Sequence, residues 1–172
     1  MKYNPRIHHK RSTRLRRYDY SQPGAYFITA NCCSTFPLFG TIIQGQMVLS
    51  EYGEIAQFEW LRTPIVRPNV SLGPFIVMPD HLHGIIIIDY PHSGKINLLE
   101  TPEVAPFISP SQSIGAIMRG FMGTVTSQIN KLRNTPNENV WQLRFHDHII
   151  RSEKAIQRIT RYIENNPLNW KG

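Results

Sequence analysis

Apolar residues recur along this chain with two different periods, and the changes of period outline the expected secondary structure. Runs of β-forming residues predict a short hairpin at 38–49 and strands at 25–33, 70–77, 82–88 and 145–150. Apolar positions with a period of about 3.6 residues predict three helices. The first is expected to begin at 51 and to end before Thr63-Pro64, and the second to extend from about 111 to 132. The third is expected to begin at about 152 and to end before Pro167.

Each predicted helix has an apolar stripe that is expected to face the core. In the first helix the stripe consists of Ile55, Phe58, Trp60 and Leu61. In the second helix it consists of Ile114, Ile117, Met118, Phe121, Val125, Ile129 and Leu132. In the third helix it consists of Ile156, Ile159 and Ile163.

The order of these elements predicts the fold class. The first six major elements follow one another as βαββαβ, the split-βαβ pattern of ferredoxin-like folds. We therefore predict an α+β fold: an antiparallel sheet with helices on one face, plus a C-terminal helix. Residues 1–20 are predicted to be a basic N-terminal arm, and 21–172 a single domain with a proline-rich surface loop at 90–110.

The positive charge is concentrated at two places in the sequence. The chain carries 19 Lys and Arg against 12 Asp and Glu, a net charge of +7. Residues 1–18 contain seven bases and no acid, 19–118 have a net charge of −5, and 119–161 have a net charge of +5. This asymmetry favours a polyanionic partner, approached by the arm and the C-terminal third. A basic tail that only improves solubility is the alternative.

Composition excludes several classes of protein. The two cysteines, Cys32 and Cys33, are adjacent and supply neither a disulfide framework nor a CxxC zinc motif. The longest apolar run, 84–88, is far too short to span a bilayer. The basic N-terminal residues lack the apolar stretch of a signal peptide. We therefore expect a cytoplasmic globular domain.

Two histidines begin the most apolar predicted strand. His81 and His83 alternate with Leu82, so both imidazoles are expected on one face of the strand, about 6.6 Å apart, while Leu82 faces the core. Imidazoles in this arrangement are suited to holding a divalent metal ion. A pair of half-exposed surface histidines is the alternative, and an HxH pattern by itself does not separate the two.

The last predicted helix carries a second set of polar groups. Tyr162 lies about 80° from the centre of the apolar stripe at 100° per residue, and Arg158 and Asn166 lie one turn before and after it. A phenol, a guanidinium and a carboxamide thus share one edge of the helix. A tyrosine at the boundary of the core is the alternative reading. Asn166 also precedes Pro167, which biases it away from helical geometry.

Three motifs in this order resemble the single-tyrosine HUH transposases, and most closely their REP-associated branch. They are MPDHLHGIIII, WQLRFHDHIIR and YIENNP, and the resemblance covers about 26–167. It implies a ferredoxin-like catalytic domain in which His81 and His83 are metal ligands and Tyr162 is the nucleophile. Asn166 matches the polar residue that completes the metal site. The resemblance gives no role to His146 and His148, which we expect to be structural or at most phosphate contacts.

The activity implied by the resemblance is cleavage and rejoining of single-stranded DNA near a hairpin, through a 5′-phosphotyrosine and without ATP. Nitrogen and oxygen ligands suit Mg²⁺ or Mn²⁺ as cofactor. The DNA-binding side chains are expected to be basic residues of the arm and the C-terminal third. They are Lys10, Arg11, Arg14, Arg16, Arg17, Arg119, Lys131, Arg133, Arg151, Arg158 and Arg161. Monomer and homodimer both stay open, because the tyrosine helix could serve its own histidine pair or a partner's.

Two other functions remain open from the sequence. Ferredoxin-like sheets also build non-catalytic nucleic-acid-binding modules, although this chain has no RNP-type aromatic pair. A metal-dependent nuclease in which water attacks is the second alternative. Covalent capture of cleaved DNA separates a transesterase from a binding module, and Tyr162→Phe separates it from a water-using nuclease.

Overall fold

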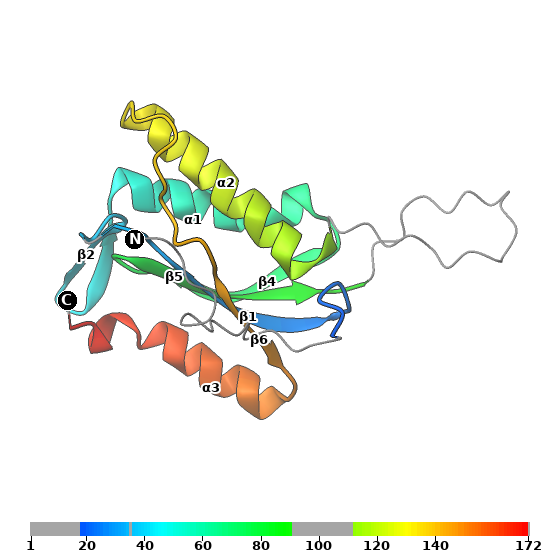
Figure 1. The fold of residues 1–172 in the computed structure, drawn as a ribbon. Coiled ribbons are helices and arrows are strands. Elements are labelled where there is room, and N and C mark those ends of the chain that lie inside the picture. Colours follow the sequence, from blue (N-terminus) through cyan, green and yellow to red (C-terminus); the bar gives the residue numbers. More distant parts are fainter. Residues whose placement is uncertain (1–17, 35, 91–111, 172) are drawn as a thin grey trace, which may run out of the picture.

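Four strands form one antiparallel sheet in the computed structural model, which describes residues 18–34, 36–90 and 112–171. The spatial order is β4-β5-β1-β6, and every neighbouring pair is antiparallel (Figure 1). The strands are β1 (Gly24–Asn31), β4 (Val70–Val77), β5 (His81–Ile88) and β6 (His146–Ile150). A separate two-stranded hairpin, β2 (Gly40–Ile43) with β3 (Gln46–Leu49), follows β1.

The described part of the chain has three α-helices, α1 (Glu51–Val66), α2 (Ile114–Leu132) and α3 (Glu153–Glu164), and a short 3-10 helix, η2 (Pro167–Asn169). Apart from the inserted hairpin, the element order is the predicted βαββαβ followed by a helix. Figure 1 shows α1 and α2 on one face of the sheet and α3 on the other. The α+β class and the antiparallel sheet are therefore confirmed, and the third helix covers the face that the first two leave open.

Serine side chains begin all three helices. Ser50, Ser113 and Ser152 each accept a hydrogen bond from a backbone N–H in the first helical turn. Such caps satisfy N–H groups that have no partner within the helix, and each contributes about 1 kcal/mol. The second helix therefore begins at Ile114, slightly later than predicted.

The first helix departs from the prediction at its end and in its buried face. It continues through Pro64 to Val66 because a proline in the last turn removes only one N–H, and the Arg67 N–H still bonds to the Thr63 carbonyl at 2.9 Å. The predicted stripe is correct for Trp60, which is fully buried. It is wrong for Phe58 and Leu61, which are 62% and 52% exposed.

Buried polar residues explain the rotated face of α1. Glu59 is buried and accepts hydrogen bonds from Gln128 of α2 at 2.6 Å and from Arg62 at 3.3 Å. Thr63, also buried, donates to the Glu59 carbonyl oxygen. With these groups turned inward, Phe58 and Leu61 are left on the outer side of α1, while Trp60 stays buried.

The other two stripes are confirmed except at their ends. In α2, the predicted residues from Ile114 to Ile129 are buried, whereas Leu132, at the end of the helix, is 52% exposed. In α3, Ile159 and Ile163 pack with Ile85 and Ile150 of the sheet, while Ile156 is 38% exposed. This small second core fixes α3 on the sheet.

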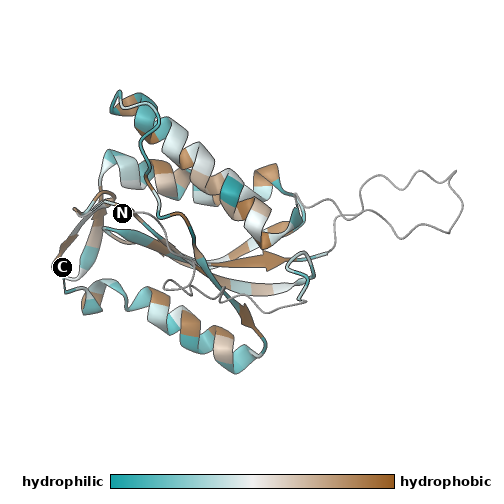
Figure 2. Cartoon of the chain, viewed as in Figure 1, coloured by the Kyte–Doolittle hydropathy of each residue, from teal (hydrophilic) through white to brown (hydrophobic). Residues whose placement is uncertain are grey.

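Hydrophobic residues concentrate on the central strands, as Figure 2 shows, and supply both faces of the sheet with apolar contacts. Tyr18 and Tyr20 pack against the main core, so the end of the predicted arm belongs to the folded domain. Residues 1–17 of the predicted arm and most of the predicted loop at 90–110 lie outside the described residues. Both cysteines are free thiols. No helix in the described ranges is long and apolar enough to cross a membrane.

Candidate active site

The histidine pair lies where the strand period predicts, on the α3 side of β5. The ring centroids of His81 and His83 are 4.5 Å apart, with an angle of 67° between the rings. Leu82 points to the opposite face and is fully buried in the main core. The alternation of β5 therefore separates packing on one face from polar chemistry on the other.

His81 has one ring nitrogen engaged and the other without a partner. Its Nδ1 lies 2.6 Å from the Asp80 carboxylate. Its Nε2 is buried and makes no hydrogen bond. A carboxylate on Nδ1 fixes the ring and favours the tautomer whose Nε2 lone pair is available, as in many metal-binding histidines.

His83 is the most buried of the polar groups in this site, at 5% exposure. Its Nδ1 is 2.9 Å from the Thr29 hydroxyl, and the Phe27 ring stacks on it with centroids 5.3 Å apart. Burial and the neighbouring His81 lower the pKa of His83 to about 3. The imidazole is therefore neutral near pH 7, which is the protonation state that a metal ligand or hydrogen-bond acceptor requires.

Tyr162 reaches this pair from α3. Its hydroxyl is 3.2 Å from His83 Nε2, and its ring meets the edge of Phe27 at 6.1 Å between centroids. The side chain is 51% exposed, so the phenol is accessible on one side and held on the other. Ile159 and Ile163, which flank Tyr162 along α3, anchor the helix on the sheet.

Asn166 is not joined to the histidines. It lies directly after α3, adopts helical geometry and precedes the short helix η2. In the described part of the chain its side chain makes no hydrogen bond with His81 or His83. The sequence argument that the residue before a proline avoids helical geometry is wrong here, because η2 begins at Pro167 with proline in its first position.

The described imidazoles fit a divalent metal ion in their chemistry. Both Nδ1 atoms face an orienting oxygen, on Asp80 or Thr29. The Nε2 atom of His81 has no partner within the described ranges, and that of His83 faces the Tyr162 hydroxyl. Among the described residues there is no group of three or more His, Cys, Asp and Glu side chains that could hold a metal. A metal bound by this pair therefore needs an amide, a water or a phosphate oxygen to complete its ligands.

The predicted DNA-binding residues are divided between the two faces of the sheet. Arg119 and Lys131 are exposed on α2, whereas Arg151, Arg158 and Arg161 are exposed just before α3 or on it. Since α2 and α3 lie on opposite faces (Figure 1), the predicted residues do not form one continuous surface. Those of the second group share the face of Tyr162.

Arg133 makes contacts within the fold, with Glu138 at 3.2 Å and with the Asn130 side-chain oxygen at 2.7 Å. The arm residues of the prediction lie outside the described ranges. They are Lys10, Arg11, Arg14, Arg16 and Arg17.

His146 and His148 lie on the same face of the sheet as the HxH pair. In the β1–β6 register, His146 is opposite Thr29 and His148 is opposite Phe27, and directly opposed residues of neighbouring strands point to the same side. Both histidines are exposed on β6, which is an edge strand. Their expected role, structural or at most a phosphate contact, stays a prediction.

The sequence analysis missed three residues that position the site. Thr29, Phe27 and Asp80 contact the histidine pair. Thr29 and Phe27 belong to none of the three motifs, and Asp80 lies within MPDHLHGIIII but was given no role. Asp80 precedes His81 and could have been found as a neighbouring carboxylate. Thr29 and Phe27 become visible only with the β1–β5 register, which pairs Thr29 with His83.

Comparison with known proteins gives a relative in sequence and several likenesses in fold. A Haemophilus influenzae protein, itself uncharacterized, is 43% identical over 173 residues, which cover 99% of this chain and 94% of that protein. This chain belongs to the family of that protein. No family model matches the chain.

The fold of this family member is similar to that of a REP-associated tyrosine transposase solved bound to a REP hairpin. The TM-score is 0.52 at 20% identity, over 91% of this chain and 73% of that one. A candidate transposase from Deinococcus radiodurans gives a TM-score of 0.43 at 17% identity, over 90% and 97% of the two chains. At these identities the likeness concerns the fold.

Proposed function

We propose that this protein is a transposase-type enzyme that cuts and rejoins single-stranded DNA, with Tyr162 as its nucleophile. The observation that carries the proposal is the 3.2 Å contact between the Tyr162 hydroxyl and His83 Nε2. It joins a half-exposed phenol to an imidazole pair suited to a metal. The likeness in fold to a tyrosine transposase supports the same activity.

The reaction is a transesterification in which the number of phosphoester bonds does not change. The Tyr162 oxygen attacks the scissile phosphorus, the phenol loses its proton, and the bond from phosphorus to the 3′ oxygen breaks. The 3′ oxygen leaves as a hydroxyl after taking up a proton, and the phosphate stays on Tyr162 as a 5′-phosphotyrosine. Attack by another 3′ hydroxyl reverses the step and rejoins strands, so no nucleotide cofactor is needed.

The surroundings of Tyr162 suit this role. In the tautomer with its proton on Nδ1, neutral His83 donates to the Thr29 hydroxyl and accepts a hydrogen bond from Tyr162 at Nε2. The phenol oxygen is thereby held in one position before the substrate arrives. An ordinary phenol has a pKa near 10, so deprotonation has to accompany attack.

The proposed cofactor is Mg²⁺ or Mn²⁺, held by His81 and His83 through Nε2, with Asn166 as a further oxygen ligand. When bound, the ion polarises the scissile phosphate and stabilises the charge that develops on it. His83 Nε2 has a single lone pair, so metal ligation and the hydrogen bond from Tyr162 exclude each other. Recruitment of Asn166 requires its side chain to turn toward the histidines.

The proposed substrate is single-stranded DNA beside a hairpin. The solved relative in fold is bound to a REP hairpin. This chain exposes Arg158 and Arg161 on α3, the helix of Tyr162, and Arg151 just before that helix. Basic side chains of this kind follow the phosphate backbone of a single strand. Because Tyr162 contacts His83 of its own chain, one copy of the protein holds the nucleophile and the histidine pair together.

The test is covalent capture of DNA by the full-length protein. A panel of hairpin-bearing single strands, labelled on the 3′ side, is incubated with the protein in Mg²⁺ or Mn²⁺ and run on a denaturing gel. We expect label that migrates with the protein, and we expect Tyr162→Phe to abolish it. That substitution removes one oxygen from a half-exposed ring, so the fold should be retained.

Tyr90→Phe is the matched control, because Tyr90 is equally exposed but lies at the far end of β5. It should leave the adduct in place. Cleavage without any adduct, and unaffected by Tyr162→Phe, would show a water-using nuclease. Binding of hairpin strands with neither cleavage nor adduct would show a non-catalytic binding module. Either result rejects the proposal.

A further inference from the structure

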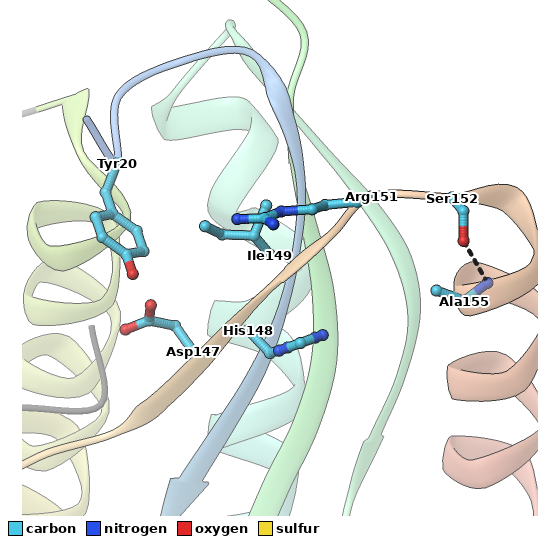
Figure 3. Close-up of a pocket in the computed structure, with 7 residues that line it drawn as sticks. All are labelled: Tyr20, Asp147, His148, Ile149, Arg151, Ser152 and Ala155. Carbon is cyan, nitrogen blue, oxygen red and sulfur yellow. Dashed lines mark hydrogen bonds between the residues drawn. The ribbon is translucent and has the colours of Figure 1, made fainter. Parts of the chain in front are cut away.

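A cleft wraps around the outer edge of β6, the edge strand nearest the N-terminal end of α3. Its volume is about 340 Å³, which lies at the small end of the range for ligand pockets. We call it the β6 pocket. Its lining residues are Tyr20, Asp147, His148, Ile149, Arg151, Ser152 and Ala155. Figure 3 shows Tyr20 and Asp147 pointing toward one another, and His148 on the other side of the strand.

The β6 pocket begins close to the nucleophile. His148 is directly opposite Phe27 in the β1–β6 register, and neighbouring strands are about 5 Å apart. Phe27 in turn contacts the Tyr162 ring, at 6.1 Å between centroids. Phe27 therefore lies between His148 and Tyr162, while Tyr20 and Asp147 lie on the other side of β6 (Figure 3). A strand bound at Tyr162 has to pass around this edge of the sheet to reach them.

We propose that the β6 pocket binds one unpaired nucleotide of the DNA strand that Tyr162 attacks, and that it favours a base with an exocyclic amino group. This inference rests on the proposed function, because it assigns a subsite to the same substrate. The pocket combines three kinds of group that a nucleotide requires: an aromatic ring, a cation and a hydrogen-bond acceptor.

Tyr20 supplies the aromatic surface. Its ring is half-buried and contacts the rings of Tyr18 and Tyr26, at 4.9 Å and 6.2 Å between centroids. A ring held in this way loses little freedom when a base stacks on it. Stacking of a base on an aromatic side chain is the main sequence-tolerant contact in single-strand binding.

Arg151 supplies the cation for the phosphate. It is exposed between the end of β6 and the start of α3 and points across the pocket in Figure 3. The nearby N–H of Ala155 already donates to the Ser152 hydroxyl at 3.2 Å, so the first turn of α3 is occupied by its own cap. The guanidinium is therefore the group of the pocket that suits a phosphate.

Asp147 determines the preference among bases. A carboxylate repels phosphate, but its oxygens accept hydrogen bonds from amino groups such as those of cytosine, adenine and guanine. The Oδ2 of Asp147 is buried, so the side chain has to turn for this oxygen to meet a base. Thymine has no amino group to offer. With Arg151 at one end and Asp147 at the other, the nucleotide is oriented with its phosphate toward the former and its base edge toward the latter.

The test is a scan with abasic nucleotides, carried out with the full-length Tyr162→Phe protein so that the strand stays uncut. A fluorescently labelled strand, chosen as the tightest binder from the panel of hairpin-bearing strands, is given one abasic position at a time. We expect binding to fall about tenfold or more at one position close to the scissile phosphate, and much less at its neighbours. Thymine at that position should also weaken binding.

Substitutions of the pocket residues test which side chains contact the nucleotide at that position of the strand. In Tyr20→Leu, the abasic strand and the intact strand should bind almost equally, because the ring that reads the base is missing. Asp147→Asn should remove the discrimination against thymine. Arg151→Ala should weaken every strand and lower the slope of log affinity against log salt. The matched controls are Tyr90→Leu and Arg62→Ala, which remove an aromatic ring and a guanidinium outside the pocket.

The outcomes separate this inference from the proposed function. A uniform abasic profile, or a position-specific loss that Tyr20→Leu leaves unchanged, overturns the β6 pocket even if Tyr162 forms a covalent adduct. Conversely, a position-specific loss that disappears in Tyr20→Leu supports the pocket even if no adduct forms, because the scan measures binding alone.

Discussion

The hydroxyl of Thr29 offers a direct test of how the site is held together. It lies on β1, 2.9 Å from Nδ1 of His83, and His83 is almost completely buried. Thr29→Val replaces the hydroxyl with a methyl group of similar size. The packing of Phe27 and the register of β1 should therefore persist, while the buried imidazole nitrogen loses its partner.

The expected cost follows from that unpaired nitrogen. A buried polar group left without a hydrogen bond costs about 1–3 kcal/mol. For a domain of this size, the same loss lowers the melting temperature by about 2–4 °C per kcal/mol. Since the hydrogen bond also orients His83, we expect the Mn²⁺ concentration that gives half-maximal adduct to rise by about 10–100-fold.

Thr29→Ser is the matched control, because it keeps the oxygen and removes only the methyl group. The assays are thermal unfolding followed by circular dichroism and a Mn²⁺ titration of covalent adduct. We expect Thr29→Ser to retain most of the metal response that Thr29→Val loses. If both variants require the same Mn²⁺ concentration as the parent, the Thr29 contact does not orient a metal ligand and the reasoning fails.

Four further predictions concern packing, the metal and the arm. Gly84→Ala should destabilise the fold by about 1–3 kcal/mol in denaturant unfolding, because a Cβ there would lie 2.4 Å from the Trp60 ring. Gly123→Ala, with open space around it, should instead stabilise by about 1 kcal/mol. His81→Ala should abolish cleavage and keep hairpin binding, and cleavage unchanged at limiting Mn²⁺ would remove it from the ligand set. Deletion of 1–17 should weaken DNA binding and flatten its salt dependence, and an unchanged slope would exclude phosphate contacts by the arm.

Local patterns predicted most of the fold because its elements have strong local signals. Serine caps mark all three helix starts, and α2 and α3 carry one-sided apolar stripes that the structure buries. Helix α1 was harder, since its inward face depends on Glu59 meeting Gln128 of another helix. A contact between residues so far apart in the sequence produces no local pattern of apolar positions from which it could be predicted.

In the candidate site, too, some features follow from local sequence patterns and others depend on contacts between residues far apart in the sequence. That His81 and His83 share a face follows from the two-residue period of a strand. The pairing of Thr29 with His83, in contrast, depends on the register of β1 against β5. The contact between the Tyr162 hydroxyl and His83 Nε2 depends on where α3 crosses the sheet. The position of Asn166 depends on how the chain turns from α3 into η2, which the sequence before a proline does not determine.

The packing of β5 explains why a buried strand is suited to hold the histidine pair. On one face of β5, Leu82 and Gly84 are fixed in the main core, where Gly84 leaves just enough room for the Trp60 ring. This packing leaves the backbone at His83 little freedom, so the imidazole on the other face is positioned by contacts that have no part in the chemistry. Tyr162 is positioned independently, by the isoleucines of α3. The nucleophile and the histidine pair therefore come from two layers, α3 and the sheet, and Tyr162 joins them through its hydrogen bond to His83 Nε2 and its ring contact with Phe27. The second core between α3 and the sheet holds this alignment, so a shift of α3 that separates the two groups also disturbs that core.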